Sequence, residues 1–203
     1  MDEATTDKPA MSRRERKKLE TRLRILDAAI ALMAERSYDD VRIEEIAKAA
    51  DVANATFFLH FPTKAALVAA FNEQISEKIA ERLKGFQLGA VDKLELVRAL
   101  VLDEWAQHAD LLQRIVVDAA AQGGKSFADS SSSLAEVIAG IVRDGQKNGD
   151  LSPEFDADIV AQCLVASWRA SSLDWAMTGD GDRARRANRQ ALDLILCGAT
   201  PRG

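Results

Sequence analysis

The residues best suited to chemistry lie together in one short stretch of the chain, from Asn54 to Lys64. Asn54 and Ala55 stand in the N-terminal half of a predicted helix, the half that meets base edges in helix-turn-helix proteins. The Asn54 amide can pair with adenine through two hydrogen bonds, and Thr56, His60 and Lys64 carry groups that bind phosphate oxygens. This combination indicates contact with DNA.

Two of these assignments have structural alternatives. Asn54 also fits a surface or turn position that touches no base, and His60 also fits packing against Phe57. Both interpretations stay open for these residues, because residue type alone does not separate a side chain that binds DNA from one that packs.

Positive charge is concentrated just before this stretch. Residues 13–24 hold seven basic and two acidic side chains, whereas residues 65–203 hold 15 basic and 20 acidic ones, and the whole chain has a net charge of −5. A basic end on an acidic protein fits phosphate contact by Arg13, Arg14 and Lys17, and Arg42 can join them. A solvated helix face is the alternative, and the neighbouring motif favours phosphate contact.

Hydrophobic periodicity predicts the helices that position these groups. A helix over about residues 13–36 carries one apolar stripe with spacings of four, three, four and three. The members of this stripe are Leu19, Leu23, Leu26, Ile30 and Met33. Two short helices follow over about residues 43–50 and 53–59, joined at Asp51, a residue type that tolerates a left-handed backbone.

The rest of the chain is predicted to be helical too, so the expected fold is all-α. Thr63 suits the N-cap of a helix ending near Lys84, and Asp92 suits the N-cap of the next one. The remaining helices are expected at about residues 92–108, 110–121, 131–147, 155–178 and 181–197.

Several classes of protein are excluded by composition. Cys163 and Cys197 form no CxxC pair and indicate a reduced cytoplasmic protein without a disulfide framework or a metal site. The chain has no uncharged apolar run long enough to span a membrane, and residues 1–12 predict a disordered tail and not a signal peptide. With two histidines, no close Cys–His pair and no acidic cluster beside either histidine, an enzyme or a cofactor site is not expected.

The pattern of residues 43–67 resembles the TetR family of bacterial transcriptional regulators. The matching residues are Ile43, Ile46, Ala47, Ala50, Val52, Thr56, Phe57, His60, Phe61, Lys64 and Leu67. The resemblance extends more loosely to Gly149-Asp150-Leu151, to Trp175 and to the final helix ending at residues 194–198. It implies a helix-turn-helix DNA-binding domain at residues 13–62 and a ligand-binding and dimerisation domain at residues 63–203.

Some positions depart from the family pattern. The family usually has Gly where Ser37 and Asp51 stand, and Thr or Ser where Val41-Arg42 precedes the second helix. Ala53 replaces the usual Ser that caps the recognition helix, and Phe58 replaces a Tyr whose hydroxyl reaches a phosphate. Each lost neutral hydrogen bond removes about 0.5–1.5 kcal/mol. Leu59 stands at a position where the family commonly has a polar residue. It is expected to contact the DNA, either at a thymine methyl group or at the DNA backbone.

The body is expected to hold a small-molecule effector of unknown identity. The candidate ligand-binding residues are Trp105, His108, Arg114, Phe127, Trp168 and Trp175. Ordinary core packing is the alternative for each of them. Arg114 and Arg169 lie in apolar stretches and need a partner if buried, which an acidic ligand, Asp118 or Asp174 could supply.

The last two helices are expected to pair with the same helices of a second copy. Their candidate interface residues are Ile159, Cys163, Ser167, Ala187, Ala191, Leu194 and Ile195. A homodimer also follows from DNA recognition, since two heads about 34 Å apart read two half-sites of a palindromic double-stranded operator. The resemblance therefore implies a repressor released by its effector. The alternatives are a ligand-independent architectural DNA-binding protein and an activator of the same fold.

Overall fold

The computed structural model describes residues 12–108 and 132–199. These ranges are helical and contain no strand, which confirms the predicted all-α fold. The helices are α1 (Arg13–Glu35), α2 (Ile43–Ala49), α3 (Asn54–His60), α4 (Ala65–Leu83), α5 (Ala90–Gln107), α8 (Ser132–Asn148), α9 (Ala157–Thr178) and α10 (Gly181–Ala199). None of these helices is both long and apolar enough to cross a membrane.

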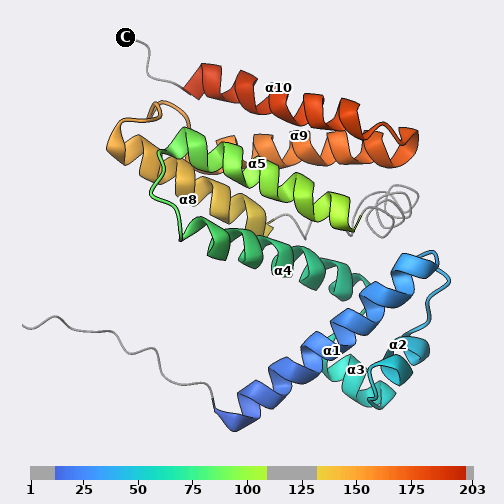
Figure 1. Ribbon diagram of the computed structural model, residues 1–203. Helices are drawn as coiled ribbons and strands as arrows, with labels where there is room; N and C mark the ends of the chain where they lie inside the picture. The colour runs from blue at the N-terminus through green and yellow to red at the C-terminus, as the bar shows by residue number, and fades with distance from the viewer. Residues whose placement is uncertain (1–11, 109–131, 200–203) are drawn as a thin grey trace, which may run out of the picture.

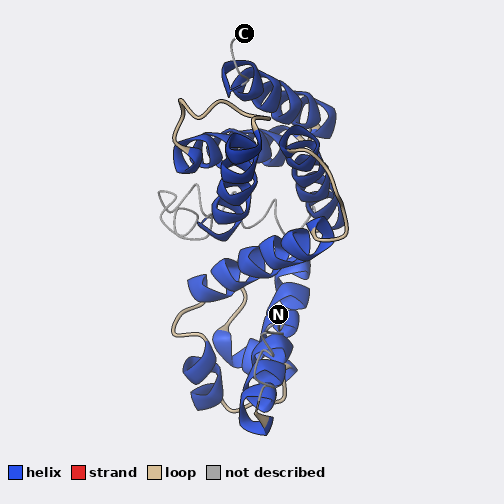
Figure 2. Cartoon of the chain, turned by 90° about the vertical axis from the view of Figure 1, so that its left-hand side faces the viewer, coloured by secondary structure: helices blue, strands red, loops and turns tan. Residues whose placement is uncertain are grey.

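The helices form a small head and a larger body. Helices α1, α2 and α3 make the head at one end, and α4 runs from the head along the base of the body (Figure 1). Helices α5, α8, α9 and α10 complete the body, with α9 and α10 at the end farthest from the head, as the view from the side also shows (Figure 2). Helix α4 is therefore the covalent and structural connection between the two parts.

Helix α1 begins at a reciprocal cap. The Ser12 hydroxyl accepts a hydrogen bond from the Glu15 amide at 3.2 Å, and the Glu15 carboxylate accepts one from the Ser12 amide at 2.8 Å. The predicted apolar stripe is wrong in its first half, because Leu19 and Leu23 are 43% and 38% exposed. The buried residues of α1 all lie from Ile25 onward, where the helix packs against the other helices.

The turn between α2 and α3 has the predicted backbone conformation. Asp51 has a φ of 53°, which places it in the left-handed region. The Val52 amide then donates to the Ala47 carbonyl at 2.9 Å, closing the turn behind α2. Asp can occupy this position at a moderate cost, so the usual Gly is not required for the fold.

Helix α5 begins two residues earlier than predicted, and Asp92 is not its cap. The Asp150 carboxylate, from the segment after α8, accepts a hydrogen bond from the Ala90 amide at 3.1 Å. Gly145 allows this contact because a Cβ there would lie 2.4 Å from the Cβ of Ala90. The cap comes from 60 residues away in sequence, beyond any local signal.

The ends of α9 follow local rules. Asp156 caps it by accepting hydrogen bonds from the amides of Asp158 and Ile159 at 2.9 and 3.1 Å. Gly179 ends it with a φ of 73°. The helix predicted at residues 110–121 lies outside the described residues.

Candidate nucleic-acid interface and effector cavity

Helix α3 has one buried face and one exposed face. Phe57 is fully buried in the head, whereas Phe58 is 51% and Leu59 76% exposed. Asn54 and Ala55 are also exposed, and Thr56 is half-buried. Most of the α3 side chains predicted to meet DNA are therefore exposed, while the buried Phe57 fixes the helix to the head, as a recognition helix requires.

The start of α3 has no side-chain cap. Ala53 occupies the N-cap position with an extended backbone, and it supplies no hydrogen bond to the free amides of the first turn. An amide of this first turn that has no acceptor in the protein can donate to a phosphate oxygen.

Lys64 has a structural role that the sequence did not predict. Its ammonium donates to the carbonyls of Tyr38 and Val41, the latter at 3.0 Å, and lies 4.3 Å from the centre of the Tyr38 ring. These contacts tie the connector after α3 to the loop before α2. Its phosphate contact stays a prediction, and replacing Lys64 would disturb the head as well.

Arg22 of α1 contacts the end of α3, the ring of Phe61 and helix α4. It was not among the residues predicted to contact DNA. Its guanidinium donates to the His60 carbonyl at 2.9 Å and lies 4.4 Å from the centre of the Phe61 ring. The same group approaches the Glu73 carboxylate on α4 at 3.9 Å. The sequence showed Arg22 only as one member of a basic run, because a contact across 38 residues leaves no local signal.

His60 lies at the end of α3 in a positively charged setting. Partial burial, followed by the nearby charges of Lys18 and Arg22, lowers the pKa of His60. The side chain therefore favours its neutral form in the absence of DNA. A phosphate beside it would reverse part of this effect, since an anion stabilises the imidazolium.

If His60 contacts a phosphate, operator affinity is expected to rise as the pH falls from 8 to 6. The pKa of His60 would be higher in the complex than in the free protein, so binding takes up a proton and is favoured at lower pH. His60→Gln is expected to flatten this dependence, measured by fluorescence anisotropy of labelled operator. The control His108→Gln changes the only other histidine and should keep the slope. An unchanged slope in His60→Gln would assign His60 a packing role.

The basic residues predicted for phosphate contact at the start of α1 and before α2 are accessible, whereas Lys64 is half-buried. Arg13, Arg14 and Lys17 are exposed at the beginning of α1, and Arg42 is exposed just before α2. The start of α1 and helix α3 lie at the same end of the molecule, away from the body (Figure 1). Exposed positive charge and the recognition helix therefore lie at the same end of the molecule.

The body contains an apolar cavity beside α4. The space within its outline is about 570 Å³, which includes open solvent, and the room for the centres of water-sized molecules is about 70 Å³. The described residues that line it are Asn72, Ile75, Ser76, Val101, Trp105, Leu134, Val165, Trp168, Arg169 and Ser172. Mostly apolar walls with a few polar groups are typical of a small-molecule site. Asp174, one predicted partner for Arg169, forms an ion pair with Arg183 at 3.0 Å.

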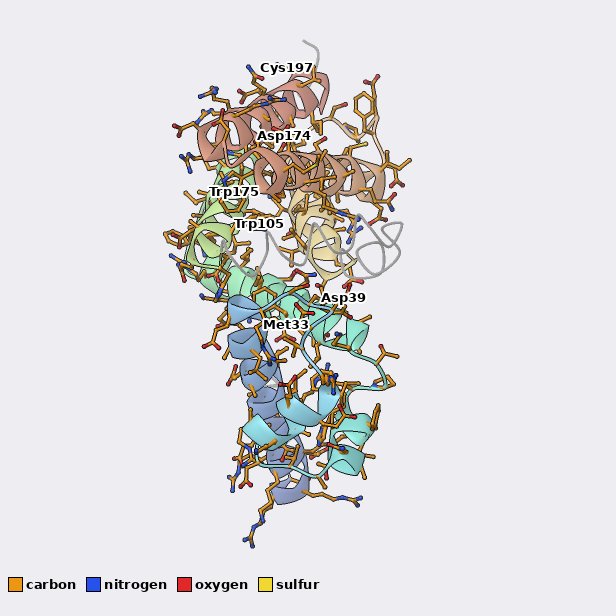
Figure 3. The ribbon with its side chains drawn as sticks, turned by 90° about the vertical axis from the view of Figure 1, so that its right-hand side faces the viewer. Met33, Asp39, Trp105, Asp174, Trp175 and Cys197 are labelled. Carbon is orange, nitrogen blue, oxygen red and sulfur yellow. The ribbon has the colours of Figure 1, made fainter. Side chains whose placement is uncertain are left out.

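A second, smaller cavity adjoins the first between α5, α9 and α10, with room of about 40 Å³ for the centres of water-sized molecules. Trp105 and Trp175 lie together here, with ring centres 6.1 Å apart (Figure 3). The structure thus brings Trp105, Trp168 and Trp175 to the walls of two adjoining cavities.

One other predicted ligand-binding residue, His108, lies apart from these tryptophans. His108 packs edge-on against Phe71 at 5.3 Å, in a separate pocket between α1, α4 and α5. His108 therefore lines a different pocket from the tryptophans, and its role in ligand binding stays a prediction. Arg114 and Phe127 lie outside the described residues.

The predicted dimer surface is accessible on α9 and α10. Ile159 and Leu194 are 60% and 76% exposed, and Cys163 is exposed as well. Ser167, Ala187, Ala191 and Ile195 are half-buried on the same two helices. Large exposed apolar side chains among small ones are what a helical interface between two copies requires.

Known proteins share both the head and the overall fold. Residues 25–71 match the family model of the bacterial regulatory proteins of the tetR family. The chain is similar to Thermus thermophilus FadR, a TetR-family transcriptional repressor solved with lauroyl-CoA, at 26% identity and a TM-score of 0.74, covering 90% of this chain and 96% of that one.

Two curated regulators are similar in sequence. The fatty acid metabolism regulator protein of Bacillus subtilis is 23% identical over 87% of this chain and 94% of its own length. The transcriptional regulator UidR of Escherichia coli K12 is 25% identical over 71% of this chain and 76% of its own length.

Proposed function

We propose that this chain, a TetR-family transcriptional regulator, is a repressor that binds a palindromic operator as a homodimer and is released by an acyl-CoA. It acts in the cytoplasm, where it meets DNA through α3 and the basic start of α1. The observation that carries the proposal is an exposed recognition helix connected through α4 to an apolar cavity.

The acyl-CoA class rests on the cavity and on one relative. Six lining residues are large and apolar, and they suit the alkyl chain of a fatty acyl group: Ile75, Val101, Trp105, Leu134, Val165 and Trp168. Thermus thermophilus FadR, 26% identical, was solved with lauroyl-CoA. A cavity of this kind favours a ligand-responsive regulator over the alternative of a ligand-independent architectural protein.

Helix α4 supplies a physical route from effector to DNA. Asn72, Ile75 and Ser76 line the cavity, while Glu73 on the same turns faces Arg22 of the head at 3.9 Å. Arg22 in turn holds the end of α3 at the His60 carbonyl. A ligand that moves α4 therefore moves the recognition helix. If it prefers a different spacing of the two heads, it must weaken DNA binding by linkage.

Titration with lauroyl-CoA is expected to produce a saturable change in tryptophan fluorescence. All three tryptophans of the chain lie at the walls of the two cavities, so the signal reports ligand entry there. Free coenzyme A is the matched control and should give a much weaker response, because it lacks the alkyl chain. An equal response to both ligands, or none to either, would contradict the acyl-CoA assignment.

A further inference from the structure

A groove lies where the head meets the body, apart from the cavities lined by the tryptophans. It has room of about 340 Å³ for the centres of water-sized molecules, whereas those two cavities have about 70 and 40 Å³. Three helices line this junction groove, with Asp27 and Ile30 on α1, Phe71 and Lys78 on α4, and Glu104 and His108 on α5. It is therefore roomier than either cavity, and its walls belong to both the head and the body.

Glu104 is a buried carboxylate in the wall of this groove. It is 3% exposed, and one of its oxygens lies 2.5 Å from the ammonium of Lys78. The side chain of Lys78 is 50% exposed, so its ammonium reaches the carboxylate from the solvent side. A carboxylate removed from water needs a cation beside it. Here that cation comes from a long, half-exposed side chain that can swing away into water.

The charged side chains that line the junction groove do not balance. Lys78 supplies one positive charge, whereas Asp27 and Glu104 supply two negative ones. Asp27 is exposed on α1 and pairs with no cation among the described residues. With His108 neutral, the groove has a surplus of one negative charge and attracts a cation.

Apolar side chains complete the walls of the groove. Phe71 and Ile75 are 4% and 8% exposed, and Ile30 lies beside them on α1. An alkyl chain that covers these residues loses its contact with water, which favours binding. A small organic cation with an alkyl chain therefore matches both the charge of the groove and its apolar walls.

We propose that the junction groove is a second effector site and that it binds an alkylamine. The ammonium of the ligand takes the place of Lys78 at the Glu104 carboxylate, and Asp27 adds to the attraction from the α1 wall. The alkyl chain covers Phe71 and Ile75. Because the walls come from the head and the body, a bound amine is coupled to the recognition helix and changes operator affinity by linkage.

Isothermal titration calorimetry with octylamine, octan-1-ol and octanoate tests the ligand class. These three molecules have alkyl chains of similar length and differ in charge. Octylamine is expected to bind about tenfold more tightly than octan-1-ol, with octanoate the weakest, because the amine alone supplies a cation. No binding of octylamine, or equal affinity for all three, would overturn the proposal.

Two substitutions are expected to act in opposite directions. Lys78→Met removes the internal competitor and leaves Glu104 without its cation, so octylamine should bind about tenfold more tightly. Asp27→Asn removes one attracting carboxylate and should weaken octylamine by about threefold. The matched control is Lys84→Met, since Lys84 pairs with Glu81 at 2.6 Å and does not line the groove. Unchanged affinity in Lys78→Met, or an equal change in the control, would overturn the site.

Thermal unfolding provides a readout that also serves if Lys78→Met is too unstable for calorimetry. This variant is expected to melt at a lower temperature than the unmodified protein, because its buried carboxylate has lost its cation. Octylamine should restore more of this loss than octan-1-ol does. Equal recovery with both molecules would show that the ammonium does not reach Glu104 and would overturn the proposal.

Fluorescence anisotropy of labelled operator tests the effector role. Saturating octylamine is expected to change operator affinity by about threefold or more, and Asp27→Asn should need more octylamine for the same change. Operator affinity that does not respond would overturn the role as an effector site. Lauroyl-CoA binding is followed separately by tryptophan fluorescence, so either proposal can fail while the other stands.

Discussion

Replacing Phe57 with Ala is expected to unfold the head and abolish operator binding. Phe57 is fully buried, with its ring centre 6.0 Å from that of Phe61, in a head built from α1 and the two short helices α2 and α3. Truncating a buried Phe to Ala costs about 3–5 kcal/mol. Since whole domains are stable by only about 5–15 kcal/mol, a small head cannot absorb this loss easily. Denaturant unfolding followed by circular dichroism measures the change.

The adjacent residue provides the control. Phe58 is 51% exposed and touches Phe57 only edge-on, at 5.5 Å. Phe58→Ala is therefore expected to change the free energy of unfolding by about 1 kcal/mol or less, and to weaken operator binding by loss of contact. Equal destabilisation by the two substitutions would contradict the assignment of one phenylalanine to the core and the other to the DNA surface.

A charge placed on the α9–α10 surface is expected to separate the proposed dimer and remove most of the operator affinity. Leu194 is 76% exposed on the described chain, so Leu194→Glu should leave the fold intact and place a carboxylate in the interface. Sedimentation velocity should then show a monomer at micromolar concentration. Losing the second head removes the advantage of two linked sites, about 10²–10⁴-fold in affinity.

Leu88 serves as the matched control for this substitution. It is another exposed leucine, 37% accessible, in the connection between α4 and α5. Leu88→Glu is expected to keep both the dimer and the operator affinity. A dimer that persists in Leu194→Glu would show that the two copies meet elsewhere, and a protein that is already monomeric would contradict the two-head account.

Features with a local cause could be predicted from the sequence. The helix-turn-helix was visible because apolar spacing, a turn residue tolerant of positive φ and two inward phenylalanines all lie within about twenty residues. Asp51 has the expected backbone, and α9 ends at Thr178, as the range expected for this helix predicted. The aromatic residues of the body were recognised as candidates, although only their positions in space assign them to cavities.

Features that depend on distant contacts could not be predicted in this way. The cap of α5 comes from Asp150, and the end of α3 is held by Arg22, which had been counted only as positive charge. Lys64 was assigned to phosphate because of its type, yet its ammonium binds backbone carbonyls inside the head. Leu19 and Leu23 continue an apolar stripe beyond the part of α1 that packs.

Capture of genomic DNA fragments by the purified protein, with and without lauroyl-CoA, tests the central claim most directly. The fragments are sequenced, and their enrichment is compared between the two conditions. The account predicts that the captured fragments share an inverted repeat whose half-sites suit two recognition helices, and that lauroyl-CoA removes the enrichment. Fragments without a shared repeat, or a repeat captured equally in both conditions, would contradict it.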